Sequence, residues 1–283
     1  MERGPNVSLM KKPDPLANAE FRRVAQAIRG RIRDGTYQPG QRLPAAPALA
    51  QELDSNRSAV ERAVRVVAAE GLLTTRQGSG AYVSRIIQTI TRDGTARYQK
   101  AKREEASGPD GAPARGAFEA ELRRMGLVPR NVPSVRREVP PAEVAELLGV
   151  SADEVSVVVR DRRMYAAPAE AAHNDLGTPV QIATTYIPLD IAGGTVLEDH
   201  DTGAGGMISR LAEMGHEQTR ISERIRTRTP TPEEAEFLTL DLDNRVYQLT
   251  HIAWTAVGRA VEVTLHILPA SLWELSYSWD IDS

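Results

Sequence analysis

Residues 18–85 read NAEFRRVAQAIRGRIRDGTYQPGQRLPAAPALAQELDSNRSAVERAVRVVAAEGLLTTRQGSGAYVSR. Their first apolar side chains recur at the spacing of a helix: Phe21, Val24, Ala25, Ile28 and Ile32. Gly35 then provides the left-handed residue that commonly follows the end of a helix. A shorter apolar run over residues 48–53 breaks at Asp54-Ser55-Asn56. The stretch therefore predicts one long helix followed by a short one.

A third helix is predicted from Arg57 to about Glu70. Asn56 is its expected N-cap, because the side-chain oxygen can accept the free amide of Ser58 or Ala59. Four residues should face inward: Val60, Ala63, Val64 and Val67. Five polar residues are left on or beside the outer face: Arg57, Ser58, Glu61, Arg62 and Arg65. Two helices joined by a short turn, followed by strands at 72–75 and 81–83, predict a winged helix-turn-helix.

The charge is distributed unevenly along the chain. The net charge is only −3, but residues 18–85 hold 11 arginines against 6 acidic residues, whereas residues 115–283 hold 16 arginines against 26 acidic residues. A basic segment displaces counterions from DNA phosphates, and an acidic segment is repelled by them. The first part is therefore the candidate DNA-binding part.

The first segment resembles the DNA-binding domain of the GntR-type bacterial repressors. The resemblance rests on RIRDGTYQPGQRLPAAPALAQEL, NRSAVERAV and AAEGLLTTRQGSGAYV. It implies that the third helix enters the major groove and that the wing approaches the minor groove. Position by position, it implies that Arg57 reads a base, with further contacts from Asn56, Ser58, Arg62, Gln77, Gly78, Arg42 and Arg22. An arginine at this place can bond O6 and N7 of guanine.

Two positions depart from that family's pattern. The family usually has an acidic-basic pair where this chain has Ala46-Pro47, and it often has an arginine in place of Glu61. These differences imply either a different operator half-site or a lower DNA affinity. Each candidate contact also has a structural alternative, since an exposed arginine is by default solvated and Gly78 can simply permit a tight wing turn.

Composition excludes several other classes of protein. With 283 residues, 41% hydrophobic and 26% charged, the chain has room for two domains. It has no run of 18 apolar residues, no signal-peptide core and no cysteine, so we expect a cytoplasmic protein. Its five histidines lack metal-ligand spacing, and no P-loop or dinucleotide motif occurs, so no metal or cofactor is expected.

The remainder of the chain predicts an α+β domain. Residues 1–17 are expected to form a flexible lead-in, and residues 86–114 a linker that ends in the Gly- and Pro-rich ASGPDGAPA. In residues 115–283, helices are expected at 118–125, 140–150, 207–214 and 231–240, and strands at 134–139, 155–165, 180–187, 219–228, 245–255 and 260–268. Thr231 and Glu234 are placed to form a capping box. Such an order favours a mainly antiparallel sheet.

This second part resembles the UTRA effector-binding domain of the HutC-like branch of GntR regulators. The phrases are REVPPAEVAELLGV, TTYIPLDI, TPTPEEAEFLTLD and GRAVEVTLHIL. The resemblance implies a chorismate-lyase-like fold that binds a small, often anionic, metabolite. It implies effector contacts at Arg162, Thr184 or Thr185, Tyr186 and Glu262. Side chains alternate along a strand, so Thr264 and His266 join Glu262 on one face. An arginine suits a carboxylate or a phosphate because its planar fork donates two parallel bonds.

Alternatives remain open at this site. Arg162 can instead form a salt bridge with a nearby carboxylate, and His266 and Tyr186 can be structural. The family's second arginine, its glutamate before the TTY motif and its final tyrosine are replaced here by Met164, Ala183 and Leu268. A common sugar-phosphate pocket is therefore not expected, and the pocket can even be degenerate.

The sequence as a whole predicts a homodimeric transcriptional repressor that binds a palindromic operator and responds to a small-molecule effector. An effector-independent DNA-binding protein and a small-molecule enzyme with an accessory DNA-binding domain are the alternatives. A fused aminotransferase-like domain is excluded, because it needs a lysine Schiff base and the second domain has no lysine.

Overall fold

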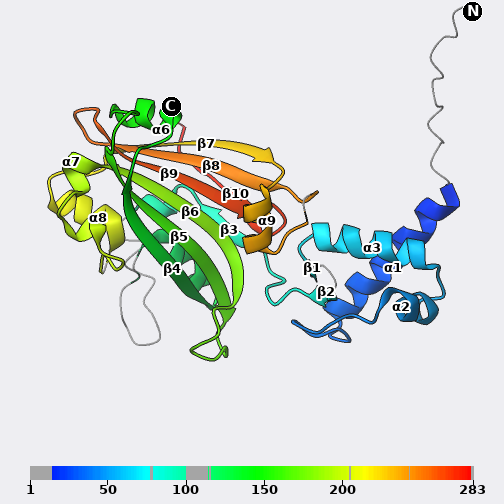
Figure 1. Ribbon diagram of the computed structural model, residues 1–283. Coiled ribbons are helices and arrows are strands. Elements are labelled where there is room, and N and C mark those ends of the chain that lie inside the picture. The colour runs from blue at the N-terminus through cyan, green and yellow to red at the C-terminus, as the bar shows by residue number, and fades with distance from the viewer. Residues whose placement is uncertain are drawn as a thin grey trace, which may run out of the picture. The chain divides into compact units, whose positions relative to one another are not determined.

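The computed structural model describes residues 15–76, 79–99, 114, 116–203, 205–241 and 243–281 (Figure 1). The chain divides into two compact units, Met1–Ser84 and Arg85–Ser283. This division falls one residue before the predicted end of the DNA-binding domain. None of the helices within these described ranges combines the length and the apolar character that crossing a membrane demands.

The first unit is a winged helix-turn-helix. It contains α1 (Pro15–Arg33), α2 (Ala46–Glu52), α3 (Arg57–Ala69) and an antiparallel pair of strands, β1 (Leu73–Arg76) and β2 (Gly80–Val83). The three helices and the strand pair share one core, in which Val24, Ile28, Val60 and Val67 are fully buried. These residues belong to the apolar faces expected from the sequence, so the predicted fold of this part is confirmed.

The second unit is built on a six-stranded sheet in which every neighbouring pair of strands is antiparallel. In spatial order its strands are β4 (Leu127–Glu138), β5 (Val157–Pro168), β6 (Thr178–Pro188), β9 (Ala260–Pro269), β8 (Val246–Trp254) and β7 (Arg220–Arg228). With the helices on its faces, this sheet confirms the predicted α+β class.

The two faces of the sheet are covered differently. One face packs against α6 (Ala142–Leu148) and α9 (Pro232–Leu238). At one end of the other face lie α5 (Ala117–Arg124), β3 (Ile90–Asp93), η1 (Ala96–Tyr98) and β10 (Trp273–Ser276). At its opposite end lie α7 (Leu189–Ala192), η2 (Val196–Glu198) and α8 (Gly206–Glu213). Between these two apolar ends, the second face carries polar side chains, which form the candidate site described below.

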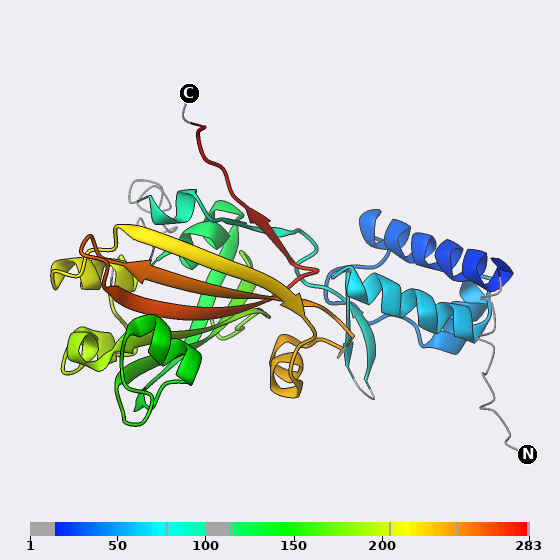
Figure 2. The ribbon, with the colours of Figure 1, turned by 90° about the horizontal axis from the view of Figure 1, so that it is seen from above.

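The predicted linker is in part a structural element of the second unit. Within residues 86–114, β3 pairs in parallel with β10, with Ile90 opposite Trp273 (Figure 2). Ile90 and Trp273 are buried in one apolar cluster with Leu122, which stabilises this pairing by removing apolar area from water. This strand could not be predicted from local composition, because its partner lies near the other end of the chain.

Several strands are longer than predicted. The strand expected at 134–139 begins at Leu127 and includes Pro129 and Pro133. Proline is tolerated there because β4 is an edge strand, where a missing amide faces away from the ladder. β5 and β6 likewise extend into residues 166–179, the interval left between their predicted strands, so the connection between them is shorter than expected.

Candidate functional site

The start of α3 is held in place by hydrogen bonds that come from α1. Asn56 caps the helix by accepting the Ala59 amide at 2.9 Å, as predicted, and its side-chain nitrogen donates to Glu20 at 2.7 Å. Arg23 donates to the backbone carbonyls of Leu53 and Asp54, in the turn between α2 and α3. Glu20 and Arg23 were not predicted to take part, because a helix pattern alone does not reveal which distant turn a polar side chain reaches.

Arg57 and Ser58 are the exposed residues of the first turn of α3. The Arg57 side chain is 71% exposed, and its Nε donates to Glu61 one turn later, at 2.7 Å. An exposed pair of this kind is weak and screened by salt, so it breaks easily when a stronger partner approaches. The Arg57 guanidinium is therefore available to a base edge. Both ends of the Asn56 side chain are already hydrogen-bonded, so Asn56 holds the start of α3 in place.

The other predicted DNA contacts lie in different settings. Arg62 is exposed but stacks its guanidinium over the ring of Phe21, at 3.8 Å from the centroid. The backbone of Arg42 forms an isolated β-bridge with Tyr82, and the Arg42 side chain lies over Gly80 in the wing. Arg22 is exposed on α1. Gln77 and Gly78 lie outside the described residues.

In the second unit, four predicted effector residues form one chain of hydrogen bonds on a single face of the sheet. Arg162 donates to the Thr185 hydroxyl at 3.0 Å, the Thr185 and Thr264 hydroxyls are 2.7 Å apart, and Thr264 donates to Glu262 at 2.7 Å. Since Thr264 gives its proton to Glu262, Thr185 must donate to Thr264. Hydrogen bonds that all run in the same direction polarise and strengthen one another.

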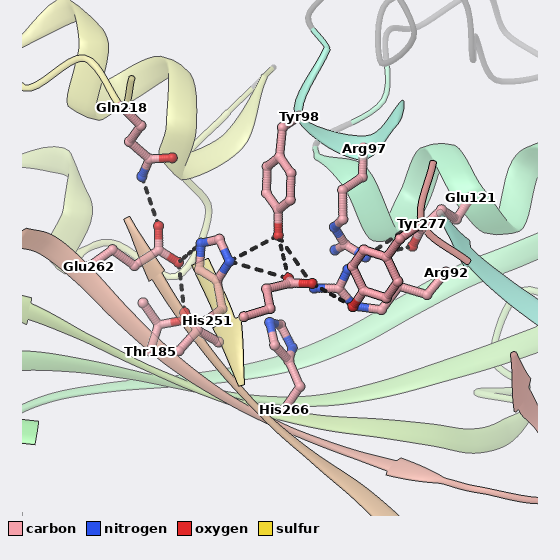
Figure 3. A network of polar contacts seen from close by, with 12 residues as sticks. Arg92, Arg97, Tyr98, Glu121, Thr185, Gln218, His251, Glu262, His266 and Tyr277 are labelled. Atoms are coloured by element: carbon pink, nitrogen blue, oxygen red, sulfur yellow. Dashed lines mark hydrogen bonds and ion pairs between the residues drawn. The ribbon is translucent and has the colours of Figure 1, made fainter. Parts of the chain in front are cut away.

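His266 lies on the same face, next to this chain of bonds (Figure 3). Its Nδ1 is 2.9 Å from the amide nitrogen of Gln181. Burial lowers the pKa of His266 well below its ordinary value of 6.5, and the nearby Arg92 and Arg97 lower it further. The imidazole is therefore neutral at physiological pH and presents one donor and one acceptor.

Thr184 and Tyr186, which were also predicted as effector contacts, do not belong to this face. Side chains alternate along β6, so these two point to the side opposite from Thr185. Thr184 donates to Asp161 at 3.2 Å, and Tyr186 is buried in an apolar cluster with Val159. Of the two threonines offered as alternatives, Thr185 is the one that lies on the polar face.

A second polar network, which sequence reasoning missed, adjoins the first. Arg92 of β3 forms an ion pair with Glu223 of β7, and the two side chains are only 2% and 6% exposed. Glu223 also accepts the hydroxyls of Tyr98 at 2.8 Å and Tyr277 at 2.7 Å (Figure 3). His251 of β8 places its Nδ1 at 2.9 Å from the Tyr98 hydroxyl and 3.4 Å from Glu223.

The charges of this network balance within the fold. Burial disfavours the Glu223 carboxylate, but a hydrogen bond from His251 and the charge of Arg92 outweigh it and hold the pKa of Glu223 well below 4.5. Arg97 pairs with the buried Glu121 at 3.0 Å. His251 gave no usable signal, because β8 reads VYQLTHIAW and does not alternate regularly, and Arg92 lay in the stretch interpreted as linker.

Some hydrogen-bonding capacity remains on this face. The buried Nε of Arg162 and Nη1 of Arg92 have no hydrogen-bond partner among the described residues. Burial lowers the pKa of Arg162, while Glu262 raises it. The Glu262 carboxylate accepts the Gln218 amide at 2.8 Å in addition to Thr264. The face therefore offers an unsatisfied donor at Arg162 that two hydroxyls join to the Glu262 carboxylate, and a separate unsatisfied donor at Arg92 beside Glu223.

Known proteins resemble both units. Residues 21–83 match the family described as bacterial regulatory proteins, gntR family, and residues 125–272 match the UTRA domain. An uncharacterised HTH-type transcriptional regulator of Streptomyces coelicolor is 26% identical over 264 residues, which cover 93% of each chain. A histidine utilization repressor of Pseudomonas putida is 38% identical over 72 residues, 25% of this chain and 27% of the repressor.

The fold also has a counterpart among solved structures. The crystal structure of PhnF from Mycobacterium smegmatis superposes with a TM-score of 0.54 at 19% identity, covering 92% of this chain and 100% of the other. At this identity the likeness concerns the fold.

Proposed function

This chain belongs to the GntR family of bacterial regulatory proteins and carries a UTRA domain, and we propose that it is a repressor whose operator affinity is set by a small molecule. The family predicted from the sequence is thereby confirmed. Its relatives are transcriptional regulators and not enzymes. Repression is supported by relatives that are named repressors, among them the histidine utilization repressor. Such a protein acts in the cytoplasm, where its operator is.

DNA recognition is assigned to α3. The observation that carries this proposal is the exposed pair of Arg57 and Ser58 at the start of a helix that α1 clamps through Glu20 and Arg23. A rigidly held helix N-terminus with an exposed arginine is the geometry of a major-groove reader. Two copies related by a two-fold axis read a palindrome, because the symmetry of the protein is mirrored in the operator.

The effector is assigned to the polar face of the sheet in the second unit. An anionic or acceptor group of the ligand would satisfy the free Nε of Arg162, and a donor group would bind Glu262. Coupling between effector and DNA typically amounts to about 1 to 3 kcal/mol, which is a 5- to 150-fold change in operator affinity.

The test begins with a thermal-shift screen of amino acids, organic acids and sugar phosphates, followed by operator binding with each stabilising compound. Arg162→Ala should abolish the response to that compound while leaving operator affinity unchanged. Arg163→Ala is the matched control, since Arg163 is the next residue on β5 and stacks on Phe237 at the opposite face. A normal response in Arg162→Ala would assign Arg162 a structural role.

A second candidate is an effector-independent DNA-binding protein. It is favoured by the fact that Arg92, Tyr98 and Tyr277 of the chain itself bond Glu223, beside the candidate site. In that case no compound of the screen would raise the melting temperature, and operator binding would be the same in Arg162→Ala with every compound.

A further inference from the structure

The end of the described chain carries two strongly exposed apolar side chains. Trp279 is 79% exposed and Ile281 is 89% exposed. Apolar residues occur at every second position from Leu275 to Ile281, with serine or aspartate between them. This alternation is typical of a strand that buries one face. The first part of it is indeed β10, but no described residue of the same unit buries Trp279 or Ile281.

The direction of this tail is fixed by the backbone just before it. The Ser278 amide donates to the Thr95 hydroxyl at 2.9 Å, and that hydroxyl donates to the Ser278 carbonyl at 2.7 Å. One residue earlier, the Tyr277 hydroxyl donates to Glu223. Since Ser278 is held on both sides, Trp279 leaves the unit in an extended direction and does not fold back over Tyr277.

A cleft of about 380 Å³ lies in the same unit, along β7. It is lined by Gly94, Tyr98, Ile221, Ser222, Glu223, Ile225 and Tyr277. The only charged group in this lining, Glu223, already binds Arg92, Tyr98 and Tyr277, so it does not require a polar ligand. The rest of the lining is Gly94, Ser222, two isoleucines and two tyrosine rings, a mostly apolar surface that suits an aromatic side chain.

β7 is also an unpaired edge. It ends the sheet order and pairs with β8 alone among the described strands. A free edge binds a further strand through backbone hydrogen bonds. Ile221 and Ile225 face the cleft, whereas Arg224 and Arg226 alternate to the other side, where both are exposed and have no carboxylate partner in the described part of the chain.

We propose that the tail of one copy, residues 279–281, docks along β7 of a second copy and places Trp279 in this cleft. Side chains alternate along both the tail and β7, so the two patterns match. Trp279 and Ile281 would face the cleft, and Asp280 would face Arg224 and Arg226 on the other side. Because each copy has both a tail and a cleft, two such contacts form around one two-fold axis. The proposal deepens the homodimer of the proposed function and rests on it.

The absence of cysteine from the chain makes a direct test possible. We would prepare three single variants that keep Trp279 and the cleft, Asp280→Cys, Arg224→Cys and Arg226→Cys, and oxidise the tail variant mixed with either β7 variant. A disulfide needs Cα atoms within about 7 Å of each other, so only a docked tail gives a covalent dimer. We expect a covalent heterodimer in at least one mixture and none when a β7 variant is oxidised alone. All three positions are exposed, so the variants should fold, which melting curves would verify.

Light scattering separates this inference from the proposed dimer itself. The dissociation constant of the dimer should rise at least tenfold in Trp279→Ala and stay unchanged in Val257→Ala, a control that removes an equally exposed apolar side chain at the β8–β9 turn. If the unaltered protein is dimeric, yet neither mixture is crosslinked and Trp279→Ala dimerises normally, the docked tail is wrong and the homodimer stands. If the unaltered protein is monomeric at micromolar concentration, both are wrong.

Discussion

Replacing Glu61 should strengthen operator binding, because this residue competes with DNA for Arg57. The two side chains are 71% and 42% exposed and lie one helical turn apart. Such a pair contributes about 0.3–0.5 kcal/mol, which Arg57 must give up before it reaches a guanine. In Glu61→Gln this cost disappears, and the dissociation constant should fall roughly twofold. Arg57→Ala should instead weaken specific binding by about 1 to 3 kcal/mol.

The measurement is fluorescence anisotropy with an operator duplex selected from a random library by the unaltered protein, and with a scrambled duplex. Glu70→Gln is the matched control: it removes the same charge from the end of α3, but Glu70 pairs with Arg29 and not with Arg57. The Glu61→Gln gain on the operator should be lost when Arg57→Ala is also present. Equal gains from Glu61→Gln and Glu70→Gln would refute the competition and leave only a general effect of charge.

Two further predictions concern the stability of the second unit. Glu223→Gln should lower the free energy of unfolding of the second unit by about 3 to 5 kcal/mol, because Arg92 is left buried without a counter-charge. An unchanged midpoint in chemical unfolding would show that the pair contributes nothing. Arg137 donates two hydrogen bonds to Glu198, the Gly194 amide donates a third, and together they lower the pKa of that carboxyl from 4.5 to about 2. The stability from these contacts is therefore present above pH 4.5 and is lost as the pH falls toward 2. The melting temperature of Glu198→Gln should therefore fall less between pH 4.5 and pH 2 than that of the unaltered protein. An equal fall in both proteins would contradict this.

The winged unit was predictable because its signals are local. The Asn56 cap, the break before it and the apolar spacing of the helices all lie within a few residues of what they determine. The six-stranded sheet was also predictable in outline, since most of its strands carry β-branched residues and alternate. Strand ends were less certain, and β4 in particular continues through two prolines that only an edge position tolerates.

What could not be predicted depends on contacts between distant parts of the chain. The pairing of β3 with β10 joins residues 90–93 to residues 273–276, and no local pattern reveals it. For the same reason Arg92 was not recognised as a buried ion-pair partner of Glu223. At the proposed effector site, the resemblance pointed to the TTY stretch as a whole, and only the register of β6 shows that Thr185, and not Thr184 or Tyr186, shares a face with Glu262.

The parallel pairing of β3 with β10 has a consequence for synthesis on the ribosome. The described residues of the winged core all lie between Val24 and Val83, so this unit can fold while the chain is still being translated. The second unit cannot be completed until residue 276 has left the exit tunnel, because its first strand, β3, pairs with its last strand, β10. A nascent chain therefore holds a finished DNA-binding module for roughly 10 to 40 seconds before the second domain is complete.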